Sequence, residues 1–176
     1  MKINNHNRLH KQSGTSNMEM LFYFIIAALV LVGAVALGMK LFGKQTNSSE
    51  QAGITNLIIN TRALKGSQGY GPAGTDLTSQ LIVTEGIPDT FTVTGGVIYN
   101  AWGGVVSPVS TGPAFTLTTR AVPPSSCVAL STAIGRTRAY TTKINSGTAT
   151  TGEVTSGVAS ASCDSDSNTV AWTVSQ

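Results

Sequence analysis

Histidine is absent from the chain after residue 10, because His6 and His10 are the only two in the sequence. Without an imidazole, residues 15–176 cannot build a histidine-dependent catalytic triad or a histidine-ligated metal site. Since carboxylates are also sparse and no free thiol is expected, we expect no enzyme, and we assign no catalytic residue, metal ligand or cofactor to this chain.

Charged residues are also scarce, at 11% of the chain against about 25% in ordinary soluble proteins. Ser and Thr together account for 42 residues, which is typical of a secreted, β-rich surface. The net charge of +3 comes from Lys2, Arg8 and Lys11, since residues 15–176 carry eight basic and eight acidic side chains. A neutral body without a basic patch predicts no direct nucleic acid binding.

Cysteine occurs only twice, at Cys127 and Cys163. Their separation fits neither a CxxC redox motif nor a zinc pattern, so pairing with each other in a disulfide is the better interpretation. Such a bond persists only in an oxidising compartment. We therefore expect the C-terminal half of the chain to leave the cytoplasm.

One long apolar stretch, Met20–Met39, contains no charged residue and lies between Glu19 and Lys40. Twenty helical residues span about 30 Å, which is the thickness of a bilayer core. Basic residues precede the stretch, and the positive-inside rule places them in the cytoplasm. The sequence therefore predicts a transmembrane helix, with everything after Lys44 exported.

An ordinary secretory signal is the competing interpretation, because a basic region, an apolar stretch and Ala34-Val35-Ala36 imitate its three parts. The apolar run is longer than the roughly 7 to 15 residues of a signal core. Glu19 also stands at its edge without a neighbouring cation, and an unpaired carboxylate costs a few kcal/mol in hydrocarbon. Glu19 is therefore either a functional residue or a marker of the membrane surface.

A specific motif precedes the apolar run: Gly14 is followed by Thr15, and Glu19 stands five residues after the glycine. This arrangement resembles the class III signal of type IV pilins, a short basic leader that is cut directly after its final Gly. The resemblance implies that prepilin peptidase requires Gly14 and that Thr15 becomes the new N-terminus. It also implies that Glu19 is the assembly carboxylate, with the new amine of Thr15 as its expected partner.

Helical spacing continues beyond the apolar run, and the glycine at position 66 is a natural stop signal. We predict one long helix over about residues 16–65, whose second half packs an apolar face on a domain. For Gly33 and Gly38, local unwinding and close helix packing in the bilayer are equally good interpretations. The residues of the predicted packing face are Ile54, Leu57, Ile58, Thr61 and Leu64.

The remaining chain reads as a Gly- and Pro-rich loop followed by short alternating segments. In the last segment, Val170, Trp172 and Val174 are expected on one face. A short helix with a hydroxyl N-cap should follow Pro124 and end at Gly135. The predicted loop covers 66–74, the helix 127–134, and the strands 91–93, 97–100, 115–118, 138–144 and 168–175.

One string imitates a metal motif, because Asp164, Asp166 and Asn168 copy the first ligand spacing of a calcium loop. Thr169 and Ser175 occupy the positions where such a loop needs its turn-forming Gly and its bidentate Glu. An ordinary polar turn is the better interpretation.

Three further strings give a narrower resemblance: LIINTRALKGSQGYG at 57–71, GGVIYNAWGGVVSPV at 95–109 and VPPSSC at 122–127. Their order after the leader resembles type IVb pilins, particularly the major subunits of conjugative thin pili and their enterobacterial relatives. The fold implied is α+β, a long N-terminal α-helical spine packed on an antiparallel β-sheet domain with one disulfide. The implied parts are a cleaved leader at 1–14, the transmembrane and filament-core half of the helix at 15–43, its periplasmic half at 44–66 and a head domain at 67–176.

The function implied is the major structural subunit of a type IVb pilus, which polymerises with itself into an extracellular filament for conjugative mating-pair stabilisation or adherence. The prepilin would first reside in the inner membrane. Its expected partners are prepilin peptidase, the inner-membrane assembly machinery, an outer-membrane secretin, and the recipient or host cell surface. The alternatives are a minor pilin or type II secretion pseudopilin and, in a different class, a single-pass membrane-anchored binding protein.

Overall fold

The computed structural model describes residues 17–136 and 138–175, and within this part it leaves the side chains of residues 33–44 undescribed. The predicted leader at 1–14, with Gly14 at its end, and the predicted new N-terminus Thr15 lie outside the described residues. The chain divides into two compact units, Met1–Phe42 and Gly43–Gln176. The long predicted helix is confirmed as α1, Asn17–Ala63, which contributes residues to both units.

In the first unit, α1 places Glu19 in its first turn, where the helix dipole favours a carboxylate. The backbone is helical at both Gly33 and Gly38, so the local unwinding that was one interpretation of these glycines is not found. No helix in the described part of the chain has the length and apolarity expected of a membrane span. The predicted span at 20–39 extends into the residues whose side chains are not described.

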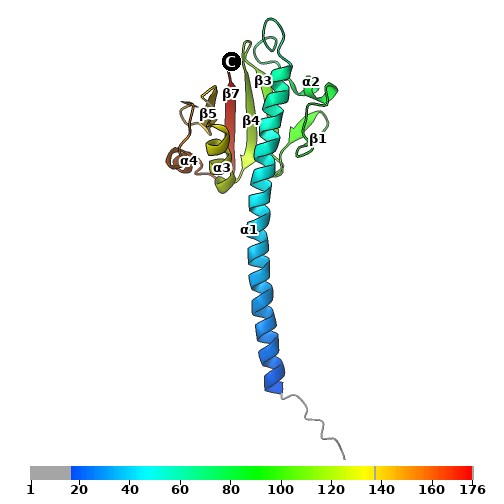
Figure 1. Ribbon diagram of the computed structural model, residues 1–176, viewed down its shortest axis with the longest axis vertical. Helices are drawn as coiled ribbons and strands as arrows, with labels where there is room; N and C mark the ends of the chain where they lie inside the picture. The colour runs from blue at the N-terminus through cyan, green and yellow to red at the C-terminus, as the bar shows by residue number, and fades with distance from the viewer. Residues whose placement is uncertain (1–16, 137, 176) are drawn as a thin grey trace, which may run out of the picture. The chain divides into compact units, whose positions relative to one another are not determined.

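The second unit includes the C-terminal part of α1 as well as the predicted head domain at 67–176, and from here on we call the whole unit the head. It contains a seven-stranded sheet of order β1-β2-β3-β4-β7-β5-β6 (Figure 1). Every neighbouring pair of strands is antiparallel. The strands are β1 Thr92–Thr94, β2 Val97–Tyr99, β3 Val105–Ser110, β4 Phe115–Val122, β5 Tyr140–Ile144, β6 Thr150–Thr151 and β7 Asn168–Val174; the shorter helices are α2 Thr78–Val83, α3 Pro124–Ile134 and α4 Ser156–Ser162. Figure 1 shows α2 beside β1, α3 beside β7, and α4 beside α3.

A single hydrophobic core joins one face of this sheet to the helices. In β7 the predicted face is confirmed, because Val170, Trp172 and Val174 are buried while the residues between them are half-buried. The apolar face predicted for α1 is also confirmed, since its residues from Ile54 to Thr61 have no exposed surface. The head is therefore a two-layer α+β unit with its helices on one side of the sheet.

Helix α3 begins three residues earlier than predicted, with Pro124 in its first turn and Pro123 as N-cap. The expected hydroxyl cap is wrong, because the N-cap residue is Pro123, whose side chain has no oxygen to accept a hydrogen bond. The predicted end at Gly135 is confirmed, but its φ of −67° is not left-handed. A Cβ at Gly135 would lie 2.6 Å from the Ser131 carbonyl oxygen, so close packing explains the glycine.

Strand β3 was not predicted, and its proline explains why. Proline within a strand normally argues against a central position. The carbonyl oxygen of Pro108 accepts a hydrogen bond from the N–H of Leu77, so it points away from β4. The nitrogen and the carbonyl oxygen of one strand residue point to the same side, so the proline nitrogen points away from β4 as well. The ladder with β2 has already ended at Val106, and the missing N–H therefore costs no sheet hydrogen bond.

The predicted disulfide between Cys127 and Cys163 is confirmed, with a Cα–Cα distance of 5.9 Å. It joins the first turn of α3 to the C-cap of α4. Helix α4 was not predicted, because its sequence SGVASAS has small residues without an apolar period. Thr155 caps it by accepting a hydrogen bond from the N–H of Val158.

Candidate assembly surfaces

The first candidate surface is formed by the apolar side chains all round the N-terminal part of α1, from Met18 to Val32. Its large apolar side chains are between 43% and 79% exposed within the described chain. An uninterrupted apolar surface of this length is a marker of burial in a membrane or against other protein chains. The side chains are Met18, Met20, Leu21, Phe22, Tyr23, Phe24, Ile25, Ile26, Leu29, Val30, Leu31 and Val32.

Glu19 lies at the start of this surface and is exposed. It is the one acidic residue among the large apolar side chains of the helix start. Its expected partner Thr15, like Gly14, lies outside the described residues. The pairing of Glu19 with the amine of Thr15 therefore stays a prediction.

A second feature is a buried acid, Glu50, which joins the part of α1 within the head to the turn after β2. Glu50 has no exposed surface, and its Oε1 accepts a hydrogen bond of 2.6 Å from the N–H of Ala101. Sequence analysis did not single out this residue. The signal was its spacing, because Glu50 stands four and seven positions before Ile54 and Leu57 and so belongs to the same buried face of α1.

The turn that Glu50 contacts is built around Asn100. Its Oδ1 accepts hydrogen bonds from the N–H of Trp102 (3.0 Å) and of Gly104 (2.7 Å). Its Nδ2 donates to Thr119 Oγ1 (2.9 Å) and to the Arg120 carbonyl oxygen (2.7 Å). A Cβ at Gly104 would lie 1.8 Å from that carbonyl oxygen, so the position requires glycine. The YNAWGG string is therefore a structural turn that joins β2 and β3.

Burial raises the pKa of Glu50 above its ordinary value of 4.5, and the hydrogen bond from Ala101 opposes this only in part. The second oxygen, Oε2, is buried without a hydrogen-bond partner. The Oδ1 of Asn47, three residues earlier on the helix, is buried and unpartnered as well. The site therefore favours the neutral carboxyl group.

We expect Glu50→Gln to stabilise the head at neutral pH. Because the folded state raises the pKa of Glu50, this group stabilises the fold most below pH 4.5, and its contribution is lost as the pH rises through the folded-state pKa. Glutamine keeps an acceptor for Ala101 and carries no charge, so the gain above that pKa should be about 1–2 kcal/mol.

Urea unfolding of residues 43–176 between pH 4 and pH 8 measures this effect. The free energy of unfolding of the natural head should fall as the pH rises through the pKa of Glu50. That of the variant should show no such fall. Glu153→Gln, at an exposed acid, is the control and should leave the profile unchanged. A lower stability of Glu50→Gln at pH 7 would show that the charged form is the one that the fold prefers.

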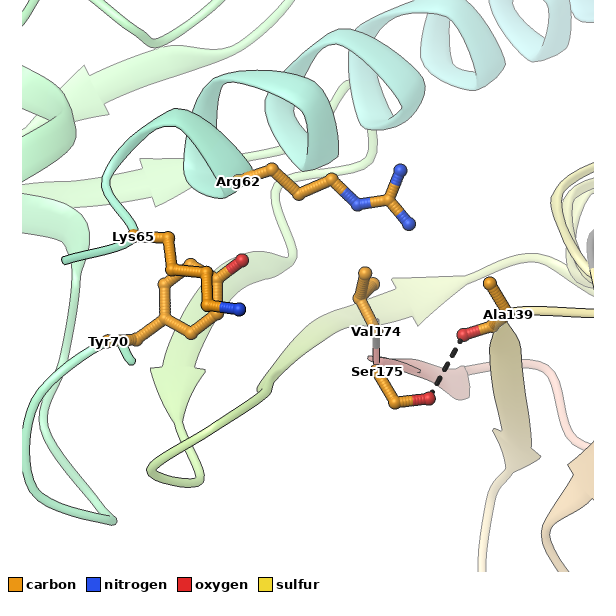
Figure 2. A pocket seen from close by; sticks show the side chains of 6 residues that line it. All are labelled: Arg62, Lys65, Tyr70, Ala139, Val174 and Ser175. Carbon is orange, nitrogen blue, oxygen red and sulfur yellow. Dashed lines mark hydrogen bonds between the residues drawn. The ribbon is translucent and has the colours of Figure 1, made fainter. Parts of the chain in front are cut away.

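The second candidate surface is a basic hollow of about 380 Å³ on the head, shown in Figure 2. Arg62 and Lys65 come from the end of α1 and the residues after it, and Tyr70 from the following loop. Figure 2 shows these three side chains opposite Val174, Ser175 and Ala139. The hollow therefore combines two cations with a partly apolar wall.

The side chains of this basic hollow are held by aromatic contacts. The guanidinium carbon of Arg62 lies 5.2 Å from the centroid of the Tyr140 ring, a cation–π contact. The Tyr70 ring packs edge-on against Phe115 at a centroid distance of 5.0 Å. Burial raises the pKa of Tyr70, and the charge of Arg62 opposes that change, so the hydroxyl stays protonated at neutral pH.

The calcium-like string forms a turn organised by Asn168. Its Oδ1 accepts from the Nδ2 of Asn145 (2.8 Å), and its Nδ2 donates to the Val122 carbonyl oxygen (3.1 Å). Asp164 and Asp166 are exposed. Across the described residues, no group of three or more candidate ligand side chains comes together at a metal site.

Comparison with known proteins finds a matching family model and matching solved structures. A family model described as PilS N terminal matches residues 44–175. The crystal structure of the type IVb pilin from Salmonella typhi matches with 28% sequence identity and a TM-score of 0.58, over 76% of this chain and 99% of that one. No curated protein sequence matches the chain.

Proposed function

Since the chain belongs to the PilS family and is a type IVb pilin, we propose that it is the major structural subunit of a type IVb pilus. As a pilin it is a structural protein that assembles with copies of itself into an extracellular filament. The proposal adds that this chain forms most of the filament, and that it first resides in the inner membrane.

The observation that carries the proposal is the exposed apolar surface from Met18 to Val32. Burying apolar area stabilises by about 25 cal/mol per Å², so a helix with large side chains exposed on all sides requires a covering environment. A bilayer covers such a helix in the prepilin, and neighbouring copies cover it in the filament. The same surface therefore serves both stages, with the segment at 20–39 as the membrane anchor.

The proposed route begins with cleavage by prepilin peptidase after Gly14, which exposes the amine of Thr15. Assembly machinery in the inner membrane then extracts the subunit, and the filament leaves through an outer-membrane secretin. The head of a major subunit would face the recipient or host cell, for mating-pair stabilisation or adherence. A minor pilin or a type II secretion pseudopilin is the alternative, since either would present the same apolar helix.

We expect mass spectrometry and N-terminal sequencing of pili sheared from cells to find Thr15 as the first residue of the chain. The reason is the five-residue spacing from Gly14 to Glu19 at the edge of the apolar run. Gly14→Val should leave the uncleaved chain in the membrane fraction, while Ser13→Ala, at the neighbouring position, should be cleaved as usual. A first residue of Leu37, which a conventional signal peptidase would leave, would overturn the proposal.

Abundance decides between a major and a minor subunit. If the chain is the main component of the sheared filaments, the proposal holds. If filaments of normal number persist in cells that lack this chain, it is a minor pilin or a pseudopilin.

A further inference from the structure

A second hollow on the head has the opposite charge to the basic hollow. It has a volume of about 420 Å³, and two acidic side chains, Glu85 and Asp89, stand beside an apolar lining. Its residues come from α2, from the turn after it and from β1. The residues that line this acidic hollow are Leu81, Ile82, Glu85, Ile87, Asp89 and Val93.

The turn that carries Glu85 is held firmly in place. The N–H of Gly86 donates to the Leu81 carbonyl oxygen (2.8 Å), and the Nδ2 of Asn60 on α1 donates to the Gly86 carbonyl oxygen (2.8 Å). Glu85 itself has a φ of +53°, in the left-handed region that non-glycine residues rarely adopt. The carboxylate is therefore presented to solvent from a constrained backbone.

Apolar side chains on this part of the head are exposed as well. Val83, at the end of α2, is 84% exposed, and Ile82 and Val93 in the lining are 40% and 42% exposed. In the head as described, these are among the few large apolar residues with substantial exposure. A patch that joins apolar side chains to acidic ones suits the long side chain of a lysine or arginine, whose stem is apolar and whose end is charged.

Within the described part of the chain, no carboxylate pairs with the cations of the basic hollow, and no cation pairs with the carboxylates of the acidic hollow. Among the side chains that the structure describes, no acidic oxygen lies within 4.0 Å of a basic nitrogen. Lys65 is half-buried in the basic hollow, and Glu85 and Asp89 are exposed at the acidic one. These groups therefore remain available to a charged partner outside the chain.

We infer that the basic hollow of one copy contacts the acidic hollow of the next copy in the filament, with Lys65 and Arg62 facing Glu85 and Asp89. This inference rests on the proposed function, because it concerns copies packed in a filament. A helical filament is built from heterologous contacts, in which two different surfaces of the same chain meet. The two hollows fulfil that requirement, being separate in sequence, opposite in charge and each partly apolar.

The apolar parts make the contact more than a pair of surface charges. An exposed ion pair contributes little, because water screens it. When Val83 and Ile82 pack against the half-buried Ala139 at the wall of the basic hollow, the charges become partly desolvated and their attraction strengthens. The opposite charges also select one alignment of neighbouring copies, because an alignment that brings like charges together is repelled.

The contact can be tested in cells that assemble the full chain, first by reversing one charge at a time and then by swapping both charges. Lys65→Glu alone and Glu85→Lys alone should each reduce the pilus recovered by shearing about tenfold, since each places like charges at a partly buried contact. The double variant Lys65→Glu with Glu85→Lys restores opposite charges and should recover most of the wild-type yield. Lys143→Glu and Glu153→Lys are the matched controls, at exposed charges outside both hollows, and should assemble normally.

Cysteine cross-linking gives an independent measurement, because the described part of the chain contains no free thiol. Cells that express Lys65→Cys and Glu85→Cys chains together should give disulfide-linked dimers in their pili after mild oxidation. Cells that express either variant alone should give none, since the contact is heterologous.

Each outcome is decisive. The inference would be overturned if both single reversals gave a normal yield of pili. It would also be overturned if the double variant failed to recover the yield and the mixed cysteine pili gave no dimers. Dimers from one cysteine variant alone would indicate a contact between identical surfaces and would overturn it too. If the wild-type chain formed no filament at all, the proposed function itself would fail, which is a distinguishable result.

Discussion

Opening the Cys127–Cys163 disulfide is expected to lower the free energy of unfolding of the head by about 4 kcal/mol, since the bond closes a loop across a sequence separation of 36 residues. Both sulfur-bearing residues belong to the hydrophobic core. The bond ties α3 to the end of α4, a short helix with only one fully buried residue, Ala159. Helix α4 should therefore lose its structure first.

Urea unfolding of residues 43–176, oxidised and after reduction, measures the contribution of the covalent bond with every side chain unchanged. The double variant Cys127→Ala with Cys163→Ala should lose slightly more stability, because it also removes buried sulfur atoms. Hydrogen exchange should show the largest increase in residues 156–162. Equal stability of the oxidised and reduced heads would show that core packing alone positions α4.

The elements that sequence analysis predicted are those whose own pattern specifies their packing. Helix α1 and strand β7 repeat apolar residues at the period of their structure, so the face that each buries could be named in advance. Helix α4 and strand β3 carry no such pattern. Their positions depend on a disulfide to another helix and on a hydrogen bond from Leu77 to Pro108.

The surfaces of the head depend on the order of the strands, which the sequence does not reveal. The basic hollow joins residues 62–70 to Ala139 and to residues 174–175 because β7 lies between β4 and β5. An alternating segment specifies which residues face the core but not which strand lies beside it. The role of Glu50 was missed for a related reason, since its partner Ala101 lies 51 residues away.

Replacing Glu19 by alanine is expected to reduce pilus number about tenfold or more, because a buried charge pair loses far more when one member is removed than it gains on formation. Glu19 lies beside the apolar surface that we propose to be buried in the filament, and a carboxylate there must be neutralised. The amine of Thr15, released by cleavage, is protonated at neutral pH and is the cation proposed to do so.

The two charge variants separate membrane insertion from assembly. Glu19→Ala leaves the Thr15 amine unpaired, and Glu19→Lys places two cations together, so both should assemble few filaments. Both should still reach the membrane fraction and lose the leader, because insertion depends on the apolar run. Glu153→Ala, at an exposed acid of the head, is the control and should assemble normally. Wild-type pilus number and length in Glu19→Ala would contradict the pairing and would leave Glu19 as a residue that only marks the membrane edge.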